Sequence, residues 1–486
     1  MDTIIGRKSE LALLAEVFAS KRAEFVAVYG RRRVGKTYLI KNFFGNKKAL
    51  FFHVTGIKGG LLEMQLERFT QVLGDVFYQG TVLKPFKSWI EAFDALTKVI
   101  DNMSSTKKII LFFDELPWMA TPKSNLISAL EYFWNRHWTD NKRLKLIVCG
   151  SSASWMMDKV IKNRGGLHNR TTQRINLHPF SLCETEKFLH HYDHRLNRKQ
   201  LLKLYMIVGG VPFYLQQLNK HHSLDKNIND LFFSPDSLFF NEFDEVFASL
   251  FDEDESYKEI VKLIAGSHQG LLRKDVEKKI KLTGKGGRLT KRLADLEAAG
   301  FIASHIPSGH AKRGTYYRLT DEYCYFYLKW VKPIKNELKK RQHVTYWQQA
   351  AQTATYKTWV GYAFENICFK HIAEIRSALG LPDSLIGASW RYVPTKKNAQ
   401  QGAQIDLLFL QPPDVMTLCE IKHTDKPFVL EQEDYSNLQN KLAVYERETR
   451  SKVQCYFALI TAFGAKNTPY LKKLYAQVVT ADCFFE

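Results

Sequence analysis

Apolar runs alternate with amphipathic stretches over about the first 180 residues of the chain. The apolar runs are short enough to be strands, and each leads towards a stretch with helical periodicity. Strands that are apolar on both faces and alternate with helices are typical of a parallel sheet covered on both sides. We therefore expect a doubly wound α/β domain over residues 1–180, with strands at 24–29, 49–54, 109–113, 144–149 and 172–177.

The remainder of the chain has a different pattern, which predicts four further segments. Residues 181–250 are helical, with a break at Gly209-Gly210-Val211-Pro212, and we assign them to a helical lid. An acidic cluster at 252–255 marks the next boundary, and residues 251–330 predict three short helices and a hairpin with strands at 301–305 and 316–319. Residues 331–354 form a helical connector, and residues 355–486 predict an α/β domain with a helix at 358–378 and strands near 390 and at 405–410, 415–421 and 453–460.

The length of the chain is that of several folded domains, and its excess of basic residues indicates an anionic partner. The 486 residues include 70 lysines and arginines against 50 acidic residues, a formal charge of +20. Nucleic acid is the first candidate partner for such a chain, although a basic protein without an anionic partner is the plain alternative. No apolar stretch reaches the ~18 residues of a membrane span, and the seven cysteines form no CxxC pair. We expect a cytoplasmic protein with no membrane partner and no disulfide framework.

The strongest motif is a phosphate-binding loop between the first strand and its helix. The segment Gly30-Arg31-Arg32-Arg33-Val34-Gly35-Lys36-Thr37 fits GxxxxGK[ST] without a mismatch, and a helix at 36–44 follows it. Its glycines let backbone N–H groups surround phosphate oxygens at a helix N-terminus. Lys36 is expected to reach the β- and γ-phosphates, and the Thr37 hydroxyl to bind Mg²⁺. The motif predicts ATP as a cofactor.

Polar residues at the ends of two further strands complete a predicted hydrolytic site. Asp114 and Glu115 end an apolar strand, where Asp114 suits the Mg²⁺ shell and Glu115 suits the general base for water. The strand at 49–54 lies between the two motifs in the chain, which indicates the branch of P-loop NTPases with an additional strand and a catalytic glutamate. After the strand at 144–149, Ser151 or Ser152 is placed either to sense the γ-phosphate or to cap the next helix. Arg170 is a candidate for stabilising transition-state charge, in cis or in a neighbouring subunit, or is an ordinary surface arginine.

Basic residues concentrate in one part of the middle segment. Residues 268–292 contain nine lysines and arginines against two acids, about a third of the surplus charge of the chain. They lie on a predicted helix at 271–281, a turn containing Gly284, Gly286 and Gly287, and a helix from Arg288, ahead of the hairpin. This order is that of a winged helix, whose second helix lies in a DNA major groove in many proteins. Phosphate contact is the expected use of the lysines, and a protein-contact module is the alternative.

Acidic residues and a lysine converge in the C-terminal domain. A hairpin that turns at Pro412-Pro413 brings Asp406 within about one residue of facing Glu420, and Lys422 projects from the same face as Glu420. Two carboxylates can hold Mg²⁺ or Mn²⁺, and the lysine can orient or deprotonate a water for phosphodiester hydrolysis. Glu365 on the preceding helix is a further candidate ligand, or a solvated helix carboxylate. The basic and amide pairs Lys396-Lys397 and Gln400-Gln401 are candidates for lining a DNA groove.

Three histidines, His190, His191 and His194, have half of a metal-site spacing. No glutamate or third ligand accompanies them, so we expect a solvated helix face.

Taken together, the motifs resemble a family of archaeal-type P-loop ATPases. In that family an AAA-like or STAND-like ATPase precedes a winged helix and a PD-(D/E)XK nuclease-like domain of the restriction-endonuclease type. The resemblance covers essentially the whole chain and rests on these segments: Ile5-Gly6-Arg7-Lys8-Ser9-Glu10-Leu11, the phosphate-binding loop from Tyr29 to Thr37, Phe113-Asp114-Glu115, Cys149-Gly150-Ser151-Ser152, Pro179-Phe180-Ser181, Gly209-Gly210-Val211-Pro212, Tyr317-Arg318-Leu319-Thr320-Asp321, and Ile405-Asp406 with Glu420-Ile421-Lys422.

The resemblance implies ATP binding by Gly35, Lys36 and Thr37, hydrolysis by Asp114 and Glu115, and a nuclease metal at Asp406 and Glu420. The chain departs from the family pattern at Asn169, where glycine is usual, and at Gln404, where a second acid often precedes the Ile-Asp pair.

Three functions fit this sequence. The first is an ATPase that binds DNA and cleaves it with a metal-dependent site. The second is a STAND-like signalling or regulatory ATPase whose C-terminal domain binds DNA or protein without cleavage, and the third is a DNA-binding regulator with a structural nucleotide. Each allows a homo-oligomer or a protein partner.

Overall fold

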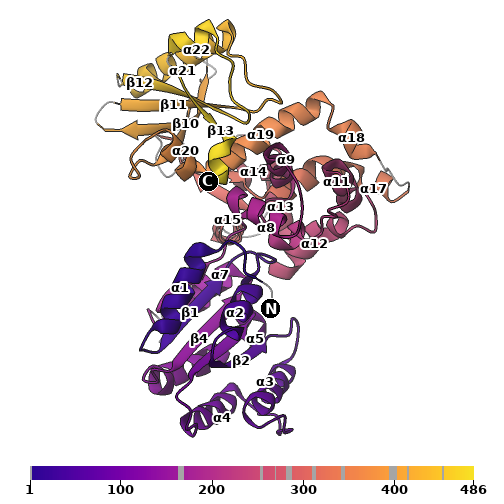
Figure 1. Cartoon of the computed structure of the whole chain (residues 1–486), viewed down its shortest axis with the longest axis vertical. Helices are drawn as coiled ribbons and strands as arrows, with labels where there is room; N and C mark the ends of the chain where they lie inside the picture. Colours follow the sequence, from indigo (N-terminus) through magenta and orange to yellow (C-terminus); the bar gives the residue numbers. More distant parts are fainter. Residues whose placement is uncertain are drawn as a thin grey trace. The chain divides into compact units, whose positions relative to one another are not determined.

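The chain forms two compact units in the computed structural model (Figure 1). The structure describes residues 3–162, 169–251, 255–268, 270–280, 287–308, 314–340, 345–392, 394, 402–412, 415–450, 452, 454–474 and 476–486. One unit comprises Met1–Phe180, Val211–Gln216 and Ala294–Gly300, and the other comprises Ser181–Gly210, Gln217–Leu293 and Phe301–Glu486.

The first unit is built on a parallel sheet of five strands in the order β2-β3-β4-β1-β5. The expected strands are all present, as β1 (Glu24–Tyr29), β2 (Ala49–Thr55), β3 (Lys108–Asp114), β4 (Leu144–Gly150) and β5 (Gln173–Asn176). The strand inserted between β1, which leads into the phosphate-binding loop, and β3, which carries the Asp-Glu pair, is β4. The sheet is therefore that of a P-loop NTPase with an additional strand, and this strand is β4. The strand expected at 49–54, which lies between the two motifs in the chain, is β2 at the edge of the sheet.

Helices cover both faces of this sheet, as its apolar strands require. Successive residues of β1 point to opposite faces, so Phe25 and Ala27 join one core while Val26 and Val28 join the other. The first core is completed by residues of α3, α4 and α6, and the second by residues of α1 and α2. The helical elements of this unit are α1 (Lys8–Ala19), α2 (Lys36–Gly45), α3 (Leu62–Phe77), α4 (Trp89–Asp101), α5 (Leu116–Met119), α6 (Leu126–Phe133), α7 (Ala153–Met156) and α10 (Pro212–Leu215), with π-helical turns at Trp134–Trp138 and Met157–Ile161.

The second unit begins with helices. Ser181 and Asn197 each accept a hydrogen bond from the backbone N–H of the third helical residue, and the side chain of that residue returns the contact, so two capping boxes start these helices. The helices are α8 (Leu182–His191), α9 (Arg198–Val208), α11 (Leu224–Phe232) and α12 (Leu238–Leu250). Of the three histidines near the end of α8, His190 and His191 are exposed, whereas His194 is buried, which corrects the expectation of a fully solvated face.

The basic segment forms three helices and a small antiparallel sheet. The elements are α13 (Glu255–Ala265), β6 (Leu271–Leu272), α14 (Arg273–Lys279), α15 (Gly287–Ala298), β7 (Ile302–His305) and β8 (Tyr316–Leu319), with the strand order β6-β8-β7. Strand β6 takes the first two residues that we had expected in a helix. The predicted turn with Gly284 and Gly286, and most of the acidic boundary at 252–255, lie outside the described residues.

Aromatic side chains of the connector pack against those of the residues just before it. Trp347 is fully buried and contacts the rings of Phe326, Trp330 and Tyr356. The 251–330 segment ends with α16 (Glu322–Phe326) and a π-helical turn at Tyr327–Val331, and the connector continues with a 3₁₀ turn at Lys332–Ile334, α17 (Lys335–Leu338) and α18 (Tyr346–Ala350). This aromatic cluster belongs to the compact second unit, so the connector is part of its core.

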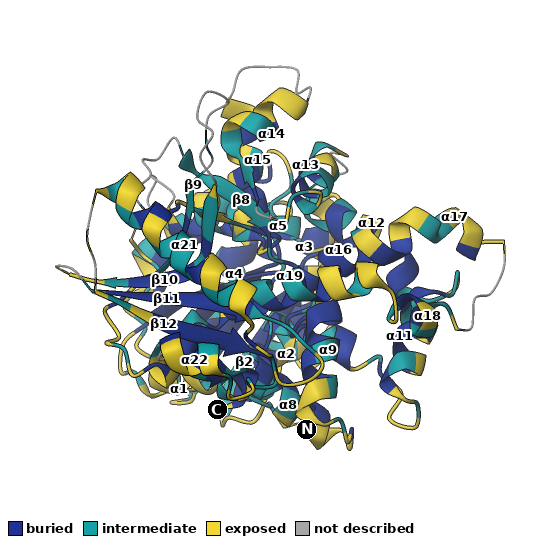
Figure 2. Ribbon diagram, turned by 90° about the horizontal axis from the view of Figure 1, so that it is seen from above, coloured by how far each residue is buried: buried dark blue, intermediate teal, exposed yellow. Residues whose placement is uncertain are grey.

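The C-terminal part is a mixed five-stranded sheet in the order β13-β12-β11-β10-β9. Strands β9, β10 and β11 are antiparallel, whereas β11, β12 and β13 are parallel. Helix α21 packs on β9 and β10, helix α19 packs on β11, and Figure 2 shows the central strands buried. The elements are α19 (Ala354–Lys370), α20 (Ile372–Ala378), β9 (Gly387–Tyr392), β10 (Ala403–Gln411), β11 (Val415–Lys422), α21 (Gln432–Thr449), β12 (Gln454–Thr461), α22 (Pro469–Leu474), β13 (Gln477–Thr480) and a 3₁₀ turn at Ala481–Phe485.

Two details of this part differ from expectation. The single helix expected at 358–378 is two helices separated at His371, and β13 adds a strand that the pattern did not indicate. Across the described residues, no helix combines the length and the apolar character that crossing a membrane requires.

Candidate functional site

The loop between β1 and α2 has the conformation of a phosphate-binding loop. Gly30, Arg33 and Gly35 have positive φ angles of 139°, 72° and 91°. A Cβ atom on Gly30 would lie 2.3 Å from the carbonyl oxygen of Leu177, so only glycine fits at this position. Lys36 is buried, and its ammonium group donates to the carbonyl oxygens of Gly30 and Arg31 at 2.9 and 2.8 Å. The loop carbonyls thus hold this ammonium group at the centre of the loop.

The two residues expected to bind Mg²⁺ at this loop contact each other. The Thr37 hydroxyl donates to Oδ2 of Asp114 over 2.9 Å. The second oxygen of Asp114, Oδ1, is buried and accepts no hydrogen bond from the described residues. A hydroxyl and a carboxylate with a spare oxygen are ligands that Mg²⁺ prefers, so the residues present fit this ion.

Glu115, the expected general base, is held by a serine that directly follows the neighbouring strand β4. It has φ = 50° and ψ = 51°, at the N-terminus of α5, and its Oε2 accepts hydrogen bonds from the backbone N–H and the hydroxyl of Ser151, both at 2.9 Å. Ser152 takes the N-cap position of α7 but makes no side-chain capping bond. The structure therefore shows Ser151 positioning Glu115, while its role as a γ-phosphate sensor stays a prediction.

Aromatic rings of α10 lie against the arginines of the phosphate-binding loop, which sequence reasoning missed. The guanidinium carbon of Arg33 lies 4.3 Å from the ring centroid of Phe213, and Arg31 donates to the Tyr214 hydroxyl over 3.3 Å. Arg32, between them in the loop, is half-buried. The positions next to Gly209-Gly210-Val211-Pro212 were the available signal, because two aromatic residues follow that break directly.

Arg7 supports the same loop from the N-terminal segment. Its buried guanidinium group donates to the carbonyl oxygens of Val34 and His178, and it lies 4.4 Å from the ring centroid of Phe180. This explains why Arg7 belongs to the motif that precedes α1.

Arg170 does not lie near the phosphate-binding loop within the chain. It precedes β5, which is parallel to β1 and pairs with it from Val26–Gln173 to Tyr29–Asn176. Arg170 is exposed at the N-terminal edge of the sheet, whereas the loop follows the C-terminal edge. This position does not support a role in cis, and a role toward a neighbouring subunit stays a prediction.

The C-terminal hairpin brings the expected acids together. The register of β10 and β11 pairs Leu407 with Cys419, so Asp406 stands opposite Glu420 one position further on. Asp406 accepts a hydrogen bond from the backbone N–H of Ile421 at 3.3 Å. Glu420 is buried, and its Oε1 lies 3.1 Å from the ammonium group of Lys422.

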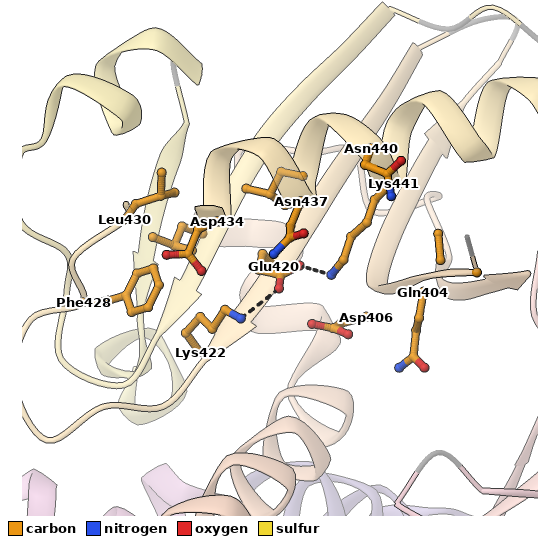
Figure 3. Close-up of a pocket in the computed structure, with 14 residues that line it drawn as sticks. Gln404, Asp406, Glu420, Lys422, Phe428, Leu430, Asp434, Asn437, Asn440 and Lys441 are labelled. Carbon is orange, nitrogen blue, oxygen red and sulfur yellow. Dashed lines mark hydrogen bonds and ion pairs between the residues drawn. The ribbon is translucent and has the colours of Figure 1, made fainter. Parts of the chain in front are cut away.

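These residues line a cavity of about 360 Å³ between the hairpin and α21 (Figure 3). Lys441 of α21, which sequence reasoning missed, forms a second ion pair with Glu420 at 2.6 Å. Gln404 and Asp434 line the same cavity. Figure 3 shows both lysines extending toward Glu420 from opposite sides. The candidates Lys396, Lys397, Gln400 and Gln401 lie outside the described residues.

Glu365 lies near the two acids but faces an arginine of β8. Burial and the neighbouring Asp406 raise the pKa of Glu365 to about 8, and burial and Glu420 raise the pKa of Asp406 to about 6. Glu365, Asp406 and Arg318 line one small cavity, and the Arg318 guanidinium lies 3.4 Å from the ring centroid of Phe369. Carboxylates that share negative charge in this way favour a cation between them.

Two carboxylates are the donors available for a metal here. In the part of the chain that the structure describes, no three histidine, cysteine or acidic side chains come close enough together to hold a metal ion. Mg²⁺ often uses one or two carboxylates together with substrate phosphates and water, so Asp406 and Glu420 fit such an ion when substrate completes its shell.

The fold and the loop geometry define a P-loop ATPase. Residues 4–218 match a family described as an ATPase domain predominantly from Archaea. This match confirms the expectation of an ATP-binding ATPase.

Two relatives and one solved structure illustrate the similarity. An uncharacterised protein of Methanocaldococcus jannaschii is 27% identical over 429 residues, which cover 87% of this chain and 88% of that protein. An uncharacterised ATP-binding protein of the same organism is 50% identical over 44 residues, or 9% of this chain and 75% of that protein. A Walker-type ATPase of Pyrococcus abyssi aligns with a TM-score of 0.48 at 17% identity, over 67% of this chain and 96% of that structure.

Proposed function

We propose that the protein hydrolyses ATP, binds DNA and cleaves it at a metal-dependent site in its C-terminal domain. The observation that carries the cleavage proposal is the placement of Asp406 opposite Glu420, with Lys422 ion-paired to Glu420 in one cavity. These three residues were also expected to converge from the sequence. Two acidic residues that face each other on neighbouring strands do not stabilise a sheet, so the fold itself gives no reason for this pair. We assign this domain to the restriction-endonuclease type.

In the ATPase unit, Lys36 binds the β- and γ-phosphates, and Thr37 and Asp114 hold Mg²⁺. Glu115 accepts a proton from the attacking water as general base. The hydrogen bonds from Ser151 orient its carboxylate.

In the C-terminal domain, Asp406 and Glu420 hold Mg²⁺ or Mn²⁺, and water and a substrate phosphate complete the shell of the ion. A metal ion bound there supplies Lewis acidity for phosphodiester hydrolysis. Lys422, as an ammonium group ion-paired with Glu420, orients the attacking water.

The basic segment provides the proposed DNA contact as a winged helix. Leu289, Leu293 and Leu296 of α15 are buried, whereas Lys291 on the same helix is exposed. On α14, the exposed lysines are Lys274, Lys278 and Lys279. Exposed lysines beside a helix that packs on its own apolar side suit phosphate contacts.

Cleavage is tested with linear and single-stranded DNA in Mg²⁺ or Mn²⁺. The wild type is compared with Asp406→Ala and Lys422→Ala. We expect nicking by the wild type alone, and equal nicking by all three proteins, or by none, contradicts the nuclease proposal.

A STAND-like regulatory ATPase is the second candidate function. It is favoured by the two lysines on Glu420, because they already neutralise one of the two proposed metal ligands. This function predicts ATP-dependent DNA retention without cleavage. In that case Arg170, exposed at the sheet edge, is a candidate contact to a second copy or a protein partner.

A further inference from the structure

Glu420 has a separate ammonium group at each of its two carboxylate oxygens. Lys422, two residues further along β11, lies 3.1 Å from Oε1, and Lys441 of α21 lies 2.6 Å from Oε2. The lysine side chains are 36% and 20% exposed, so both remain open to the cavity.

Helix α21 presents Lys441 to the cavity because of its residue pattern. Leu438, Val444 and Tyr445 are buried on the side that packs against the sheet. Asn437 and Lys441 are four residues apart and both line the cavity, so they form a polar stripe beside the apolar one. A lysine that only kept α21 soluble would lie on the exposed side of the helix instead.

The two ammonium groups carry more positive charge than is needed to neutralise Glu420 alone. One carboxylate neutralises one ammonium group, and the cavity is also lined by the amide side chains of Asn437 and Asn440. Asp434 and Asp406 are the remaining acids of the lining, and Asp406 is one of the two proposed metal ligands. When Asp406 and Glu420 bind a divalent cation, Asp434 offsets one of the two ammonium groups, and one positive charge remains for an anion in the same cavity.

We propose that Lys441 binds a phosphate of the DNA backbone together with Lys422 when a metal ion occupies Glu420, and that Glu420 holds both ammonium groups at the cavity before the metal binds. This assignment rests on the proposed DNA-cleaving function and adds a phosphate-binding residue to it. A lysine is suited to the role because its ammonium group is a point charge that binds phosphate without a fixed orientation.

The alternative is that Lys441 serves stability alone, as the partner of a buried carboxylate. The two roles differ in the salt dependence of DNA binding. Loss of one phosphate contact lowers the slope of log K against log salt concentration by about 0.9, whereas loss of a structural ion pair does not.

The test measures DNA binding by the full-length protein, by fluorescence anisotropy of a labelled duplex. Ca²⁺ at one fixed concentration occupies the carboxylates, and the KCl concentration is varied from about 50 to about 200 mM. The variants are Lys441→Gln, Lys441→Arg and the control Lys472→Gln, which changes an exposed lysine of α22. Gel analysis confirms that the duplex stays intact.

For Lys441→Gln we expect the slope of log K against log salt concentration to be lower in magnitude by about 0.9. Between the lowest and the highest salt concentration, the factor by which DNA affinity falls should then be about 3.5 times smaller for this variant than for the wild type. Lys441→Arg and Lys472→Gln should keep the wild-type slope. A wild-type slope for Lys441→Gln overturns the assignment even if that variant unfolds more easily. If the wild type itself binds no DNA, the proposed function fails, and the phosphate role of Lys441 fails with it.

Discussion

The hydrogen bond from the Ser151 hydroxyl to Glu115 makes a specific prediction about ATP turnover. Ser151→Ala removes the hydroxyl donor and leaves the backbone N–H donor of residue 151 in place, so Glu115 keeps one of its two bonds from this residue. A hydrogen bond to a charged group contributes about 1.5–3 kcal/mol. If the whole contribution orients the general base in the transition state, kcat falls by roughly 10- to 150-fold.

The substitution lies away from the residues that hold phosphate, so ATP affinity should stay near the wild-type value. Phosphate release gives kcat, and the fluorescence of a labelled ATP analogue gives the dissociation constant. Ser152→Ala is the matched control, because this neighbouring serine makes no capping bond at the start of α7. Glu115→Gln sets the lower limit of turnover.

Two results would refute this argument. A kcat for Ser151→Ala equal to or above that of the wild type would show that the bond does not help the base. A loss of ATP affinity with unchanged kcat would move Ser151 from positioning the base to binding nucleotide, as expected of a γ-phosphate sensor.

Two further predictions concern stability. Gly209→Ala should destabilise the protein by about 3–5 kcal/mol in chemical unfolding, because Gly209 has φ = 63° and its added Cβ would lie 2.6 Å from Oε2 of Glu322, which is ion-paired with Lys370. The control Gly380→Ala should lose only about 1–2 kcal/mol in the same experiment, because Gly380 has φ = 65° and open space around it. Burial and the nearby Arg318 lower the pKa of His305 to about 4, so the folded state keeps this ring neutral while the unfolded state protonates it below about pH 6.5. The contribution of the neutral His305 ring to folding stability is present above pH 6.5 and is lost as the pH falls toward 4. Thermal unfolding should therefore show up to about 3 kcal/mol less acid destabilisation for His305→Asn than for the wild type. Equal acid destabilisation of the two proteins would contradict this prediction.

The ATPase unit was predictable because local signals and tertiary structure agree there. The apolar strands of this unit are buried on both faces, and the loop motif stands between β1 and α2 as its chemistry requires. That Asp406 lies opposite Glu420 could be predicted from the hairpin alone, because the register of two paired strands determines which residues are opposite each other.

Contacts between residues far apart in the chain were not predictable. Lys441 reaches Glu420 across 21 positions, and Arg318 reaches the acids from another strand pair. Nothing in the local pattern of either segment indicates a partner. Arg170 shows the opposite case, because its motif suggested a site role while the parallel pairing of β5 places it at the other edge of the sheet.

The central claim is that Asp406 and Glu420 form a site that cleaves DNA in an ATP-hydrolysing protein. The most direct measurement is the initial rate of DNA cleavage in Mn²⁺ by wild type and by Asp406→Asn, in preparations with equal ATP turnover. We predict cleavage by the wild type at a rate at least about 100-fold above that of Asp406→Asn, because the amide removes a ligand charge that the metal requires. Equal rates, or no cleavage by the wild type, would contradict the claim.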